Sequence, residues 1–131
     1  MNATRRYAQS QNETASPERL MVLLFEAALR HMRGAAAALE GGRRSDADGA
    51  LTRASDIVAH LDATFDGARF PELGKNLGVV YRFVCQRLLT GKLESDPAPV
   101  REAERVFFPV ADAFSIAVQQ LAAERAAQGS R

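Results

Sequence analysis

The segment spanning residues 12–40 starts as a well-defined helix and then stays apolar for longer than one helix face requires. Ser16 is a suitable N-cap, and Pro17 follows it at the first helical position. Six consecutive apolar residues then occupy positions 20–25. A helix at the surface of a globular protein needs only one apolar stripe. The pattern therefore predicts a first helix that is covered on two sides.

The rest of the chain has the same helical periodicity. We expect four helices, at about residues 16–40, 45–64, 71–91 and 96–128, and no segment alternates apolar and polar residues as a strand does. Connections this short make consecutive helices antiparallel. The predicted fold is an all-α, antiparallel up-down four-helix bundle at residues 16–128, with a short N-terminal arm at 1–15 and a disordered tail at 129–131. Pro109 lies within the fourth helix and predicts a kink or a local break there.

Each of the last three predicted helices has one apolar seam at helical spacing. The seams consist of Leu51, Ala54, Val58, Leu61 and Phe65; then Leu73, Leu77, Val80, Tyr81, Val84 and Leu88; then Val100, Ala103, Phe107, Val110, Phe114, Val118 and Leu121. In the first helix, Leu20, Leu24, Ala28, Ala35 and Ala38 share one face, and Met21, Phe25, Leu29 and Met32 lie roughly 60–140° further round.

Composition excludes several classes of protein. The net charge is +1 and the basic residues are scattered, which argues against a nucleic-acid partner and against an anionic membrane surface. A single cysteine, Cys85, allows no internal disulfide and fits a reducing compartment. No apolar stretch approaches the roughly 20 residues of a membrane span, so no membrane insertion is expected. We expect a cytoplasmic protein.

The sequence offers little for catalysis, so we expect neither an enzyme nor a bound cofactor. The two histidines and one cysteine match no metal-ligand spacing, and no glycine-rich phosphate loop is present. Histidine phosphotransfer domains are four-helix bundles that resemble the pattern His-x-x-Lys-Gly, four positions from His to Gly. Here His31-Met32-Arg33-Gly34 is one residue short, and His31 falls on the predicted core face. Phosphotransfer on His31 stays a minor alternative.

Some apolar residues fall outside the seams. Val79 and Phe83 lie nearly opposite the seam of the third helix, as Ile116 does in the fourth. In one interpretation, the N-terminal arm or a second copy of the chain covers this surplus apolar surface. In the other, the surface forms a groove for an apolar helix of another protein. Both can hold, since an arm can cover a groove until a client displaces it.

Several short motifs occur in an order that resembles the FliS family of flagellar export chaperones. Thr14-Ala15-Ser16-Pro17 followed by Leu24-Phe25-Glu26 and Ala28 is similar to the opening of that family, and Phe65-Asp66-Gly67 to its second turn. Asn76-Leu77 with Tyr81 and Phe83 is similar to its Asn-Leu-x-x-x-Tyr-x-Tyr segment, and Tyr7 stands where the family has a tyrosine in its arm. The similarity spans residues 7–114. The chain departs from the family pattern at four places: Phe25 replaces a usual Tyr, Phe114 stands near a usual Trp, Arg82 replaces an acidic residue, and Gly91-Lys92 replaces an Ala-Asn pair.

The resemblance implies a cytoplasmic chaperone that binds the C-terminal helical segment of flagellin, prevents its premature polymerisation and delivers it to the flagellar type III export gate. The expected partners are therefore flagellin and a component of that gate, with a homodimer left open. From their exposed positions we expect Val79 and Phe83 to contact the client, flanked by Arg82 and Arg87. Weaker candidates are Ile57 and Leu61, and Tyr7 is expected to dock on the bundle when no client is bound. A generic helical interaction or oligomerisation module is the main alternative.

Overall fold

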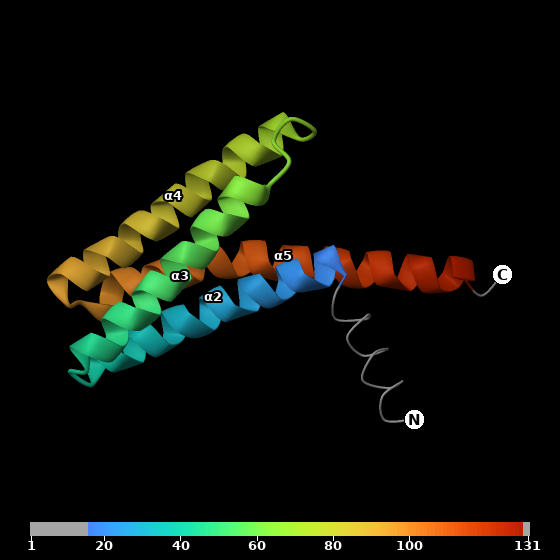
Figure 1. The fold of residues 1–131 in the computed structure, drawn as a ribbon. Helices are drawn as coiled ribbons and strands as arrows, with labels where there is room; N and C mark the ends of the chain where they lie inside the picture. Colours follow the sequence, from blue (N-terminus) through green and yellow to red (C-terminus); the bar gives the residue numbers. More distant parts are fainter. Residues whose placement is uncertain (1–15, 130–131) are drawn as a thin grey trace, which may run out of the picture.

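The computed structural model describes residues 16–129, which form four α-helices: α2 (Pro17–Glu40), α3 (Arg44–Thr64), α4 (Pro71–Glu94) and α5 (Pro97–Gly129). Helix α2 packs on α3 and α5, and α4 packs on the same two helices, whereas the diagonal pairs within residues 16–129 have no Cα atoms within 8 Å of each other. Consecutive helices run antiparallel (Figure 1). This closed ring of helices confirms the predicted all-α, up-down four-helix bundle.

The ends of the helices follow local chemistry. The Ser16 hydroxyl accepts a hydrogen bond from the Arg19 amide at 3.2 Å, which caps α2 as expected. At the other end of the bundle, α4 was predicted to end at Gly91, and this is wrong, because the helix continues to Glu94. A Cβ at position 91 would lie 2.5 Å from Cγ2 of Val100. Gly91 therefore allows α5 to approach α4 closely, and it does not terminate the helix.

Both apolar stripes of α2 contribute buried residues. Phe25, Leu29 and Met32 are buried in the main core, where the Phe25 ring lies 5.5 Å from that of Phe107 in α5. Ala28 and Ala35 are fully buried beside this stripe and belong to the same core. Both stripes of α2 therefore contribute to one core, which accounts for the long apolar run at the start of the helix.

The bundle is open at one end. Helices α3 and α4 diverge from α2 and α5 toward the turn that joins α3 to α4, as Figure 1 shows. Leu73 and Leu77, which the seam of α4 placed in the core, are consequently exposed and half-buried respectively. Leu20 and Leu24 of α2 are likewise exposed and half-buried. The seams are correct in direction, but at this end residues 16–129 cover them only in part.

Helix α5 extends beyond the rest of the bundle (Figure 1). Its buried positions stop at Ala111, and the seam residues Phe114, Val118 and Leu121 are only half-buried. The break predicted at Pro109 does not occur, because the helix continues through this residue. Pro109 and Arg105 are exposed, so water can solvate the Arg105 carbonyl that the proline leaves without its usual donor.

Ion pairs hold α2 against α5 along the length of α2. Arg125 pairs with Glu18 at 3.2 Å, Arg33 with Glu104 at 3.0 Å, and Arg101 with Glu40 at 2.6 Å. Each pair is solvent-accessible and is worth about 0–1 kcal/mol. Together they keep α2 and α5 in register, so the opening lies between this pair and the α3–α4 pair.

Length and composition alone would allow one helix of residues 16–129, α5, to cross a membrane. In the fold, the first half of α5 supplies Val100, Ala103 and Phe107 to the core. Its second half has an apolar face that residues 16–129 cover only in part, and that face borders the open end of the bundle.

Candidate helix-binding groove

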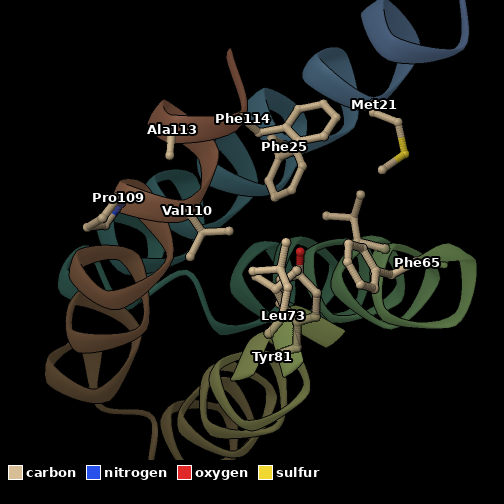
Figure 2. Close-up of a pocket in the computed structure, with 11 residues that line it drawn as sticks. Met21, Phe25, Phe65, Leu73, Tyr81, Pro109, Val110, Ala113 and Phe114 are labelled. Atoms are coloured by element: carbon tan, nitrogen blue, oxygen red, sulfur yellow. The ribbon is translucent and has the colours of Figure 1, made fainter. Parts of the chain in front are cut away.

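An apolar cavity of about 450 Å³ lies at the open end of the bundle and is accessible from solvent. Residues from all four helices and from the turn after α3 line it: Met21, Phe25, Leu61, Phe65, Leu73, Leu77, Tyr81, Pro109, Val110, Ala113 and Phe114. Figure 2 shows these side chains around the cavity. We call this feature the groove. Its lining is of the kind that recognises an apolar stripe on a helix.

Aromatic rings form the rigid part of the groove. The Phe25 and Phe114 rings lie 5.1 Å apart and are tilted by 35°, so they join α2 to α5. Behind them, Phe107 is fully buried and its ring lies 6.3 Å from that of Tyr81 in α4. Tilted rings at such distances attract one another beyond the effect of burial. The groove therefore has a preformed floor, which lowers the entropy cost of binding.

Tyr81 supplies the polar group of the lining. Figure 2 shows its hydroxyl oxygen directed toward the cavity. Burial raises the pKa of Tyr81 to about 12, and the nearby Asp62 carboxylate adds to the effect. The hydroxyl is therefore neutral at physiological pH and able to donate a hydrogen bond to a carbonyl or carboxylate of a bound segment.

The lip of the groove is apolar and exposed. Leu73, in the first turn of α4, is 51% exposed while it lines the cavity. Phe70, three residues before it in the chain, is also exposed, with the Arg69 guanidinium 5.2 Å from its ring centre. Surface of this kind on a soluble domain marks a contact site for another molecule.

The residues predicted to bind the client are distributed over different surfaces. Leu61 lines the groove although it is almost fully buried, and Ile57 lies one turn before it, half-buried against the core. Tyr7 lies outside the described residues. The remaining four expected contacts are on α4, away from the groove: Val79 and Arg82 are exposed, Phe83 is half-buried, and Arg87 pairs with Glu102 of α5 at 3.2 Å.

Sequence reasoning missed most of the groove because its residues had been assigned to the core. Helix α5 has 33 residues and α3 has 21, so at 1.5 Å per residue they measure about 50 and 31 Å. The last turns of the α5 seam therefore cannot all be covered by α3 and α4. This mismatch in length was visible in the sequence, and it identifies the end of the α5 seam, at Leu121, as incompletely covered, but it does not extend to Phe114.

Groups that could support other chemistry lie outside the groove. His31 is half-buried, and this burial lowers its pKa, with further lowering by the charges of Arg30 and Arg53. Burial also raises the pKa of the Cys85 thiol, as does Asp62 to a smaller extent. The Cys85 environment therefore favours the thiol over the reactive thiolate.

The fold and the groove define a class of protein: an all-α bundle that presents an apolar groove between two pairs of helices. The family of Flagellar protein FliS matches residues 1–121. The flagellar secretion chaperone FliS of Bacillus subtilis (strain 168) is 28% identical over 123 residues, which cover 94% of this chain and 91% of that protein. The FliS chaperone of Salmonella typhimurium is 31% identical over 113 residues, covering 82% and 84%.

The chain therefore belongs to the FliS family of flagellar secretion chaperones. This confirms the resemblance drawn from the short motifs of the sequence.

Proposed function

We propose that this protein is a cytoplasmic export chaperone, without enzymatic activity, whose groove holds the C-terminal helical segment of flagellin. The observation that carries the proposal is the apolar groove at the open end of the bundle, lined by residues of all four helices. Membership of a secretion-chaperone family supports an export client, and the shape and apolar character of the groove favour a helix.

The physical role of the groove is to replace contacts that the client makes after assembly. A terminal segment that packs against neighbouring subunits carries an apolar face, and in an unassembled subunit this face promotes premature association. Placing the segment against Leu73, Leu77 and Phe114 removes that face from water. The half-buried stripe of α5 that continues through Val118 and Leu121 lengthens the surface available to the client.

The chaperone would then deliver the bound segment to a component of the flagellar type III export gate. Binding and release of a helix in a groove require no cofactor or nucleotide. Part of the binding free energy is spent on ordering a flexible client, which keeps the complex reversible.

We propose two roles for the expected contact residues that border this region. Leu61, with Ile57 beside it, forms the α3 wall of the groove. Tyr7 docks in the groove when no client is present, since it is the one large apolar residue of residues 2–13. Contact with Phe83, and with its neighbours Val79, Arg82 and Arg87, would require the client to continue around the outer edge of α4.

Calorimetric titration with the C-terminal segment of flagellin tests the proposal. Leu73→Ser removes a groove residue that is 51% exposed, and Ile116→Ser is a matched control at a residue that is 47% exposed and does not line the groove. We expect Leu73→Ser to weaken binding by about 1–3 kcal/mol, and the control to leave it unchanged. Equal affinity in all three proteins would refute the groove as the client site. Concentration-dependent self-association without binding of the segment would support the alternative of an oligomerisation module.

A further inference from the structure

The outer face of α4 carries a regular line of exposed residues that is separate from the groove. Six residues form one line along the helix, at alternating separations of four and three positions: Lys75, Val79, Arg82, Gln86, Leu89 and Leu93. All six are exposed, and the apolar residues Val79, Leu89 and Leu93 are 55%, 54% and 70% exposed. This spacing is that of the contact line between two helices in a coiled coil. We call these six residues the α4 seam.

The α4 seam is basic. From Leu73 to Leu93 the helix contains Lys75, Arg82, Arg87 and Lys92 and no Asp or Glu, whereas each of the other helices carries several residues of both signs. Arg87 is neutralised by Glu102. Lys75 and Arg82 of the seam form no ion pair with any other described residue. Two cations and three aliphatic side chains therefore face solvent along one line.

The α4 seam and the groove lie on different sides of the same helix. At 100° per residue, Leu77 and Tyr81, which line the groove, are roughly 120–160° away from the middle of the seam. A helix about 10 Å wide separates the two surfaces. A client helix seated in the groove therefore leaves the α4 seam free.

We propose that the α4 seam docks one acidic amphipathic helix of a partner protein other than the client. Its apolar residues would pack on Val79, Leu89 and Leu93, and its carboxylates would face Lys75 and Arg82. Opposite charges across such a seam select the partner and its direction. The chaperone would thus hold the client in the groove and the partner on α4 at the same time.

Two other occupants fit less well. A second copy of the chain in parallel would place Lys75 and Arg82 directly opposite themselves, and an antiparallel copy would bring its two Arg82 residues within about one helical turn, so like charges oppose both arrangements. A membrane surface favours a wide apolar face with cations at its edges. Here the cations lie on the apolar line itself.

Fluorescence anisotropy with the full-length protein tests the proposal. The probe is a labelled, designed helical peptide with leucine at one contact position of each heptad and glutamate at the other. Leu93→Ser and Arg82→Glu should each weaken its binding about fivefold or more, equivalent to roughly 1 kcal/mol. Ile116→Ser and Arg105→Glu change exposed residues of α5 and should alter it less than twofold. The Arg82→Glu protein should prefer a version of the peptide with lysine in place of glutamate.

Several results would overturn the proposal. The first is failure of the wild-type protein to bind the acidic peptide, and the second is an equal loss of binding in the α5 controls. The third is displacement of the peptide by the flagellin segment, which would place the peptide in the groove. Binding to vesicles of phosphatidylserine and phosphatidylcholine that is lost in Leu93→Ser would assign the seam to a membrane. Dimerisation in ultracentrifugation that is lost in the same variant would assign it to a second copy.

Discussion

The rings of Phe25 in α2 and Phe114 in α5 lie 5.1 Å apart at the edge of the groove. One belongs to the segment whose excess of apolar residues is evident in the sequence, and the other follows the last buried residue of α5. Their contact stabilises the junction of α2 and α5 and forms one wall of the cavity. Fold and binding surface therefore share residues at this point.

Phe114 should matter more for binding than for folding. Because its side chain is half-buried and faces the groove, Phe114→Ala should weaken binding of the flagellin segment by about 1–3 kcal/mol. Phe107→Ala, at a fully buried ring, should instead reduce the free energy of unfolding by about 3–5 kcal/mol. Urea denaturation and calorimetric titration of both variants measure the two effects. A larger loss of stability in Phe114→Ala than in Phe107→Ala would contradict this assignment.

The residues of α4 that face the core differ in burial, and their contributions to stability should differ too. Leu88 is 1% exposed, so Leu88→Ala should cost about 2–5 kcal/mol of unfolding free energy. Leu77 is half-buried and lines the groove, and Leu77→Ala should cost about half as much, since part of its surface is already in water. Equal costs in denaturant unfolding would show that the bundle is closed in solution.

Tyr81 should titrate apart from an ordinary tyrosine. Its pKa is raised to about 12 from 10.0, so the folded protein holds this proton more firmly than the unfolded chain does. The associated stability is present below pH 10 and is lost between pH 10 and 12, with a total of at most about 2–3 kcal/mol. The chain has two tyrosines and no tryptophan. In Tyr7→Phe, tyrosinate absorbance should therefore report Tyr81 alone, and a midpoint near 10 would contradict the buried position.

Removal of residues 1–13 tests the proposed role of the arm. The four helices lie within residues 16–129, so the truncated protein should keep its helical circular dichroism. It should bind more of a dye that reports apolar surface, because Tyr7 no longer covers the groove, and Tyr7→Ser in the full-length chain should have the same effect. Unchanged dye fluorescence in both proteins would show that the arm covers nothing.

Much of the fold follows from local patterns. Helix ends and inward faces are set locally, because capping and amphipathicity act over a few residues. Examples are the start at Ser16 with Pro17, the stop at Gly41-Gly42, and the helical spacing of Val58 or Leu88. The groove could not be read in the same way. Whether Leu73 or Phe114 is covered depends on how far the α3–α4 pair diverges from α2 and α5, which is a property of the whole bundle.

The outer surface of α4 was likewise only partly predictable from the sequence. Val79 and Phe83 were correctly separated from the inward seam by their angular positions. The sequence did not show that Arg87 is held by Glu102, nor that Leu89 and Leu93 remain exposed. These features depend on where α5 packs against α4.

Site-specific photo-crosslinking to the flagellin segment tests the central claim most directly. A photoreactive amino acid would replace Leu73 at the groove, Phe83 on α4 outside the groove, or Arg105 as an exposed control on α5. The groove account predicts strong crosslinking from position 73 and none from position 105, with position 83 reacting only if the client continues around α4. Crosslinking from position 83 without any from position 73 would contradict the account and place the client on the outer side of α4.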